Sequence, residues 1–264
     1  MCRILYLSGN NGSLAIANYF IDSFVEASEN DVLGKDGPIQ HGDGFGYVIF
    51  GVHNGKRKEF SFKSIKPVFE SSEDINVLKS TLGQLDKFAL GIHSRKASAG
   101  SVNLFNVHPF HFSTKAGSSF YLMHNGTLSK DKLESDVGIA SDNDLTDSYI
   151  LGLLLSRKIE KLESGFVFDF FKNSLQYVES TLNVISMFRT VDNKQKAFLT
   201  AYSKKDFDYT KIFTYKNDYT FALASSTVSL YAEKIGIQME LLQNGQTVFI
   251  EDVFKNEIMF NSLL

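Results

Sequence analysis

The sequence has one cysteine, three prolines and no tryptophan among its 264 residues. A single cysteine cannot form an internal disulfide, so nothing in the composition points to an oxidising compartment. The scarcity of proline, together with the absence of repeats and of Pro- or Gly-rich stretches, leaves no candidate linker. We therefore expect residues 1–264 to form a single domain.

The sequence also lacks a basic surplus and long hydrophobic runs. The formal net charge is −3, which argues against a groove for nucleic acid, since such a groove needs an excess of Lys and Arg. No apolar run approaches the roughly 18 residues of a membrane span, and the first residues lack the basic start and apolar stretch of a signal peptide. These absences predict a cytoplasmic protein.

Aromatic residues are abundant, with 24 Phe and 11 Tyr in a chain that is 43% hydrophobic. Most apolar stretches are short and rich in β-branched or aromatic residues, which is typical of strands. We predict strands near residues 2–8, 44–53, 58–64, 87–93, 118–124, 183–190, 196–203, 211–215, 220–225, 238–242 and 246–251. Three- and four-residue apolar spacing predicts helices over 14–27, 72–84, 145–162 and 165–180.

Several strands follow one another with no helix between them, which favours antiparallel sheets in an α+β fold. Asn244-Gly245, between two apolar runs, predicts a two-residue hairpin. Asp192-Asn193 predicts a second hairpin with a weaker signal.

The only cysteine is Cys2, at the start of the apolar run CRILYL. A lone cysteine is usually a small apolar residue, and this one fits the beginning of a buried strand. A chemical role for Cys2 requires partners elsewhere in the chain.

The stretch HGDGFG places glycines at 42, 44 and 46. The spacing is not GxGxxG, and the run leads into a strand instead of a helix, so a phosphate loop is excluded. The glycines more simply allow the backbone to bend tightly into the strand.

Residues 91–110, GIHSRKASAGSVNLFNVHPF, form a strand end followed by a loop that carries Arg95 and Ser98. Taken alone, Arg95 suits a surface charge or a structural ion pair. A guanidinium at a strand end can instead bind a carboxylate through two parallel hydrogen bonds.

Residues 120–129, FYLMHNGTLS, form a strand that ends in His124-Asn125-Gly126 and leads toward a short helix. Asn-Gly is a common turn pair. The alternative is an oxyanion hole, in which the Asn125 amide and the Gly126 N–H both point at a developing negative charge.

Two aspartates, Asp144 and Asp147, precede an apolar helix in SDNDLTDSYILGLLL. An aspartate before a helix is first of all an N-cap, worth about 1 kcal/mol. One cap is enough, so the other carboxylate is available to a cationic group of a ligand.

Together, Cys2, HGDGFG, HSRKASxG, NxHPF, HNGTL and the TDS before a helix resemble the class II glutamine amidotransferase domains, which are N-terminal-nucleophile hydrolases. The order and spacing match from Cys2 to about Leu155, and the FALASS stretch matches the closing strands more loosely. The nearest likeness is to the stand-alone glutaminase-domain type. The resemblance implies a four-layer αββα sandwich with two mainly antiparallel sheets.

The resemblance gives Cys2 a role. Removal of Met1 would make Cys2 the N-terminal residue, and its thiolate would attack the amide carbon of glutamine to form a γ-glutamyl thioester. The new α-amino group would act as the base, because such groups titrate near 7.7–8.0. Asn125 and Gly126 would stabilise the oxyanion. No cofactor and no metal is implied.

By the same resemblance, Arg95 would bind the α-carboxylate of the substrate, with Ser98 in support. Asp147 would hold the α-ammonium group, with Asp144 as the alternative. The substrate is then a small molecule, and the ammonia would pass to a separate synthase subunit.

The sequence departs from the family pattern at Lys96, a Trp in many members, and at Ala99, a His or Gln. These positions leave hydrolysis of another γ-glutamyl amide or peptide as the alternative activity. An inactive interaction module that retains Met1 is a third possibility. Four histidines fall in the motif stretches: His93, His108, His111 and His124. A metal site is disfavoured, because His108 and His111 lie three apart in a loop with a proline between them and lack nearby acidic or Cys partners at ligand spacing.

Overall fold

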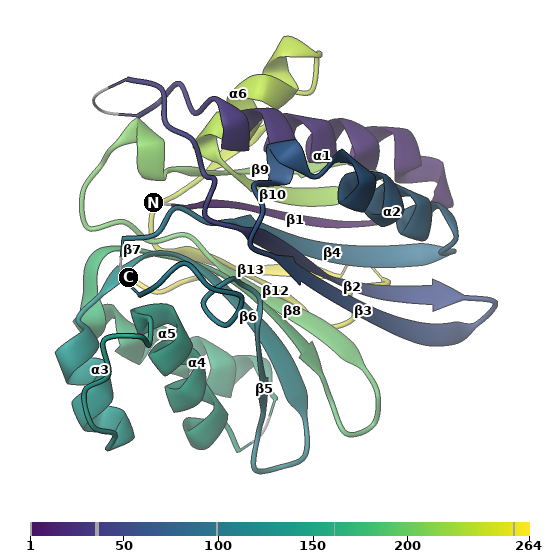
Figure 1. The fold of residues 1–264 in the computed structure, drawn as a ribbon. Helices are drawn as coiled ribbons and strands as arrows, with labels where there is room; N and C mark the ends of the chain where they lie inside the picture. The colour runs from purple at the N-terminus through teal and green to yellow at the C-terminus, as the bar shows by residue number, and fades with distance from the viewer. Residues whose placement is uncertain (1, 35–36, 99, 161, 256) are drawn as a thin grey trace.

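The computed structural model describes residues 2–34, 37–98, 100–160, 162–255 and 257–264 (Figure 1). Across these residues the strands form one seven-stranded and one six-stranded sheet, and every strand pair is antiparallel. Helices cover the outer face of each sheet, and apolar side chains fill the space between the sheets. The expected αββα sandwich of the α+β class is confirmed.

The seven-stranded sheet has the order β11–β9–β10–β1–β4–β2–β3. Its strands are β1 (Arg3–Asn10), β2 (Phe45–His53), β3 (Lys56–Ser64), β4 (Lys87–Ser94), β9 (Ile212–Lys216), β10 (Phe221–Ser225) and β11 (Glu240–Leu242). Helices α1 (Leu14–Glu29), α2 (Ser72–Gly83) and α6 (Ser226–Lys234) lie on its outer face.

The six-stranded sheet has the order β13–β12–β8–β7–β6–β5. Its strands are β5 (Phe110–Ser113), β6 (Ser119–Leu128), β7 (Val178–Arg189), β8 (Gln195–Thr200), β12 (Gln246–Ile250) and β13 (Ile258–Ser262). Helices α3 (Lys130–Val137), α4 (Asp147–Lys158) and α5 (Ser164–Ser174) cover it. Within the described residues, no helix is both long enough and apolar enough to span a membrane.

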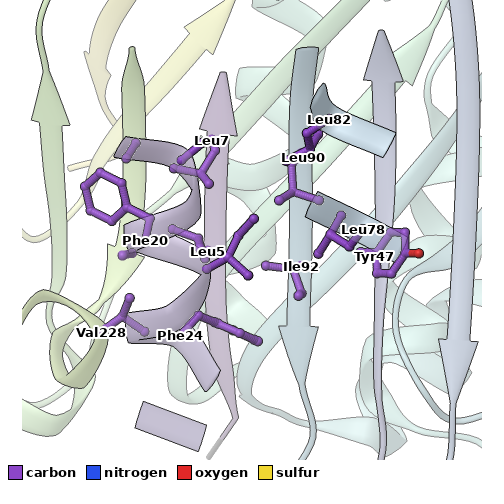
Figure 2. Packing of buried hydrophobic residues seen from close by; sticks show 14 of the residues in the cluster. Leu5, Leu7, Phe20, Phe24, Tyr47, Leu78, Leu82, Leu90, Ile92 and Val228 are labelled. Atoms are coloured by element: carbon purple, nitrogen blue, oxygen red, sulfur yellow. The ribbon is translucent and has the colours of Figure 1, made fainter. Parts of the chain in front are cut away.

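Strand β1 lies at the centre of its sheet and is buried on both faces. Leu5 and Leu7 pack against the helix layer, where Figure 2 shows them beside Phe20 of α1. Ile4 and Tyr6 point the other way, into the core between the sheets. This alternation follows from the period of two along a strand. Each buried leucine contributes about 1.5–3 kcal/mol, so the start of β1 is held firmly in place.

The segments that carry the sequence motifs meet at one end of the sandwich. Arg3 at the start of β1 pairs with Ser94 at the end of β4, and Ser94 also pairs with Phe45 at the start of β2. Strand β6 contacts β1 and β4 from the opposite sheet. Cys2, HGDGFG and HSRKAS therefore come together although up to 96 residues separate them in the chain.

Most predicted strands are present, but some elements were not anticipated. The structure adds β5, β13 and α6 to the predicted strands and helices. The predicted helix over 165–180 is wrong at its end, because α5 stops at Ser174 and β7 begins at Val178. The aromatic run of α5 has the apolar spacing of a helix, whereas β7 is fixed by pairing with β6, which is distant in sequence.

The hairpin predicted at Asn244-Gly245 is wrong, whereas the weaker one at Asp192-Asn193 is confirmed. At the first site a turn does form, with Gln246 N–H donating to Gln243 C=O over 3.0 Å and Gly245 at φ +83°. The strands on either side nevertheless belong to different sheets, since β11 pairs with β9 and β12 with β8 and β13. Turn chemistry is local, but the partner of each strand is decided by long-range packing.

Candidate active site

Cys2 directly precedes β1, and its thiol contacts the backbone just beyond the end of β4. The Lys96 N–H donates to Cys2 Sγ over 3.4 Å, and Sγ lies 3.6 Å from the Lys96 carbonyl oxygen. Burial raises the pKa of the thiol, and this is opposed by the Lys96 hydrogen bond and by the charges of Arg95 and Arg3. The thiol is therefore shielded from solvent and has cationic neighbours.

Asn125, on β6, connects the opposite sheet to Cys2. The Cys2 backbone nitrogen donates to Asn125 Oδ1 over 2.9 Å, which spans 123 positions in sequence. Since Oδ1 accepts this bond, the Nδ2 group is the part of the amide that can donate to another acceptor. Thr181 Oγ1 donates to the Asn125 carbonyl over 2.7 Å and fixes its backbone.

Gly126 follows at a position that admits no side chain. A Cβ built there would lie 2.0 Å from the Thr181 carbonyl oxygen and 2.6 Å from His124 Nε2. The ladder between β6 and β7 shifts register between Gly126 and Leu128, and such bulges re-aim the backbone near functional sites. The glycine is therefore required by the close approach of β7.

His124 supports this strand end from the helix side. Its ring nitrogens lie 2.9 Å from Ser148 Oγ and 3.1 Å from the Thr181 carbonyl oxygen. Burial lowers the pKa of His124, so the ring is neutral near pH 7. The HNG motif is thus bound to α4 on one side and to β7 on the other.

Arg95 begins the loop after β4, and its backbone is tied to the HGDGFG segment. Arg95 N–H donates to the Gly44 carbonyl over 2.8 Å, and Asp43 N–H donates to the Arg95 carbonyl over 3.0 Å. Gly44 has φ +103°, which confirms that a glycine is used for a tight bend into β2. Asp43 Oδ2 also accepts from Ala97 N–H over 2.7 Å, so this carboxylate holds the loop.

The Arg95 guanidinium is buried and bends back onto its own loop. Nη1 donates to the Ser101 carbonyl over 3.3 Å and Nη2 to the Gly100 carbonyl over 3.4 Å. Both bonds are long, so they hold the guanidinium less tightly than bonds of ordinary length would. Ser98 is exposed on the same loop, and Ala99 lies outside the described residues.

Neither predicted aspartate caps α4, because Thr146 is the N-cap and accepts from Tyr149 N–H over 3.2 Å. Asp147 is the first helical residue, and its carboxylate accepts from Leu128 N–H over 2.6 Å and from Ser148 N–H over 2.7 Å. Asp147 therefore lies beside the end of β6. Asp144 is exposed and accepts a long 3.4 Å bond from Ser101 on the Arg95 loop.

The structure thus brings Cys2 and Asn125 into direct contact, places Gly126 beside them, and links Asp147 to the same strand end. Ser98 and Asp144 lie farther out, on exposed loops.

Three of the four histidines of the motif stretches, His93, His108 and His124, are buried, whereas His111 is exposed. The His93 and His108 rings have centroids 4.0 Å apart, and burial lowers the pKa of His93 to about 3. No group of three or more His, Cys, Asp or Glu residues positioned to hold a metal ion occurs among the residues that the structure describes.

Two residues that support the candidate site, Asp43 and Arg3, were not predicted from the sequence. Asp43 holds the Arg95 loop, and Arg3 donates from Nη1 to the Cys2 carbonyl over 3.0 Å. The available signal for Arg3 was a charged residue inside the apolar run CRILYL, which is unusual in a buried strand.

Comparison with known proteins adds to this geometry. No family model and no curated protein matches the sequence. Among solved structures, the chain is similar to glutamine phosphoribosylpyrophosphate amidotransferase from B. subtilis, with a TM-score of 0.63 and 17% identity. A structure described as the allosteric regulatory enzyme of purine biosynthesis has a TM-score of 0.61 and 19% identity. In both cases the match covers 100% of this chain and 49% of the other.

A third structure, the glutamine aminotransferase class-II domain protein SPO2029 from Silicibacter pomeroyi, has a TM-score of 0.52 and 15% identity, with both chains covered in full. The chain spans about half the length of the first two relatives and the whole of the third. At these identities the likeness concerns the fold. The chain has the fold of the class II glutamine amidotransferase domains, as the motifs predicted.

Proposed function

We propose that this chain hydrolyses the side-chain amide of L-glutamine to glutamate and ammonia, with residues 1–264 as one glutaminase domain. The observation that carries the proposal is the 2.9 Å hydrogen bond from the Cys2 nitrogen to Asn125 Oδ1. It joins the nitrogen that becomes the α-amino group, once Met1 is removed, to the residue suited to bind an oxyanion. The nucleophile, its base and the oxyanion donor then lie in one place.

In the first step the Cys2 thiol gives its proton to the α-amino group, directly or through a water molecule. The thiolate attacks the amide carbon, and the carbonyl oxygen of the substrate becomes an oxyanion. Asn125 Nδ2 and the Gly126 N–H donate to this oxygen, each worth roughly 3–4 kcal/mol in comparable sites. The Gly126–Thr181 approach supports this role, because it fixes the backbone at the donor.

In the second step the α-ammonium group returns its proton to the leaving nitrogen. The carbon–nitrogen bond breaks, ammonia departs, and the γ-glutamyl group remains on Sγ as a thioester. Water then attacks the thioester with the α-amino group as base, the carbon–sulfur bond breaks, and glutamate and the free thiol are released.

Substrate binding is assigned to the charged groups around this centre. Arg95 binds the α-carboxylate through its planar guanidinium, in exchange for the long bonds to its own loop, and Ser98 supports it. Asp147 binds the α-ammonium group, and its place beside the end of β6 favours it over Asp144.

Hydrolysis of a different γ-glutamyl amide or peptide is the second candidate, and Lys96 is the observation that favours it. Lys96 departs from the family pattern, and its backbone contacts Cys2 Sγ. A residue so near the nucleophile adjoins the leaving group of any substrate. Where ammonia is the product, a separate synthase subunit is the candidate acceptor.

The test begins with the intact mass of natively expressed protein, which is expected to lack Met1. Ammonia and glutamate are then measured with L-glutamine and with γ-glutamyl peptides. Cys2→Ala is expected to retain less than about one thousandth of the activity and to lose labelling by a glutamine-like diazoketone. Retained Met1 together with no turnover of either substrate would overturn the proposal and favour an interaction module.

A further inference from the structure

The carbonyl side of Cys2 is held by a buried arginine. Cys2 precedes the first paired residue of β1, so no strand ladder fixes it. Its nitrogen is bound by Asn125, and its carbonyl oxygen accepts from Arg3 Nη1 over 3.0 Å. Terminal residues without such bonds fray, and a nucleophile must be held in place to react efficiently.

Arg3 is itself fixed by two other segments of the chain. Its side chain is fully buried, and Nη2 forms an ion pair with Asp31, just after α1. The guanidinium carbon lies 4.2 Å from the centre of the Tyr209 ring, in the loop between β8 and β9, which is a cation–π contact. The fork of the guanidinium thus joins the Cys2 carbonyl to two anchors, which the point charge of a lysine does less well.

Asp31 is in turn held rigidly, and its charge is balanced by Arg3. His41 Nε2 lies 2.7 Å from Asp31 Oδ2, and Thr227 Oγ1 donates to Oδ1. Burial lowers the pKa of His41 to about 4, so the ring is neutral near pH 7 and donates a hydrogen bond. Burial alone would raise the pKa of Asp31, but the His41 bond and the Arg3 charge keep it below its usual value.

We infer that Arg3 is a positioning residue for the proposed nucleophile. Anchored by Asp31 and Tyr209, it fixes the Cys2 carbonyl so that the amine stays at Asn125 and the thiol at the Lys96 backbone. The inference rests on the proposed function and adds a residue that the sequence motifs do not contain. Arg3 touches no substrate atom in this role. It acts through the backbone of Cys2 and through its positive charge.

Arg3→Met is expected to lower kcat at least about 30-fold, corrected for the folded fraction by circular dichroism, with KM within about 2-fold, because substrate contacts remain. Arg3→Lys keeps a donor and the charge and is expected to recover about one third or more of the lost activity. Arg57→Met is the matched control, since Arg57 also pairs with an aspartate (Asp252, 3.8 Å) and an aromatic ring (Phe254), but on β3. Its kcat is expected to be unchanged.

The pH profile separates positioning from mere support of the fold. The charged groups facing the thiol are the amino group of the chain terminus, Arg95 and Arg3, while burial raises the pKa of Tyr209 to about 12 and keeps it neutral. Removing the Arg3 charge raises the pKa of the thiol and of the α-amino group that serves as its base. The acidic limb of kcat/KM is therefore expected to move up by about half a unit or more in Arg3→Met and to stay in Arg3→Lys.

If the wild type is active and Arg3→Met has a normal kcat and an unmoved acidic limb, the inference is overturned and the proposed function stays intact. An inactive wild type overturns both. Where Arg3→Met does not fold, Arg3→Lys decides. A reduced kcat of about one third of wild type or more, with an unmoved limb and unchanged KM, supports the inference, and complete loss of activity in a folded variant contradicts it.

Discussion

The two sides of Cys2 are built differently. On the β6 side, Asn125 and Gly126 belong to a strand that is paired with β7 and backed by His124. On the other side, Arg95 and Ser98 belong to a loop that is held by Asp43 and by hydrogen bonds of 3.3–3.4 Å from the guanidinium. Within that loop Val102, Leu104 and Phe105 are about half exposed.

This contrast suits the division of labour in the proposed reaction. Donors that stabilise a transition state must be fixed to within a fraction of an ångström, and strands provide this. Groups that bind a substrate tolerate a loop, and loops can vary without disturbing the core. In the proposed reaction, the strand side would therefore carry the chemistry and the loop side the specificity.

The largest effect is expected from Gly126→Ala on the strand side. A methyl group 2.0 Å from the Thr181 carbonyl oxygen must push β6 and β7 apart, which costs about 1–3 kcal/mol in stability and displaces Asn125. We expect activity to fall by about 10³-fold or more, as measured by ammonia release. The control is Gly165→Ala in α5, where a Cβ meets nothing within 4 Å, and stability and kcat should hold.

Asn125→Ala is expected to lower kcat by about 10²–10³-fold with KM little changed, because the oxyanion exists only after the ground state. Asn183→Ala is the matched control. Asn183 lies directly opposite Asn125 in the ladder and bonds Thr210 and Tyr202, so its loss should reduce stability but leave kcat of the folded enzyme normal. A change confined to KM in Asn125→Ala would contradict the oxyanion assignment.

On the loop side, Arg95→Lys is expected to raise KM by about 10- to 100-fold, since a point charge cannot replace the two-pronged contact with a carboxylate. Steady-state kinetics with glutamine and with its α-carboxamide analogue test this, because only glutamine should show the difference between the variants. Equal damage with both substrates would mean that Arg95 supports the loop through Gly100 and Ser101 alone.

The smallest effect is expected at the helix that carries Asp147. Thr146→Ala removes the N-cap bond to Tyr149 and should lower the free energy of unfolding by about 1 kcal/mol in chemical denaturation. Thr146→Ser, which keeps the hydroxyl, should restore most of it. If Thr146→Ala loses much more activity than the unfolded fraction explains, the cap also positions the Asp147 carboxylate for substrate binding.

The strand side could be predicted from sequence better than the loop side. The strands next to Cys2 and around Asn125 are short apolar runs, and the motifs mark their positions in the sequence. The Asn244-Gly245 hairpin failed because a turn pair carries no information on which sheet each neighbouring strand joins. The cap of α4 was assigned to an aspartate because Thr, Asp and Ser are all good caps, and only the geometry selects Thr146.

The central place of β1 has a consequence for hydrogen exchange. Its amides are paired with β4 and β10, and its side chains are buried on both faces, so they exchange only when the whole sandwich unfolds. The amides of the loop after Arg95 exchange through local openings instead. Cys2 is attached to this strand. In the proposed reaction, we therefore expect the fluctuations that admit and release substrate to occur around the nucleophile without moving it.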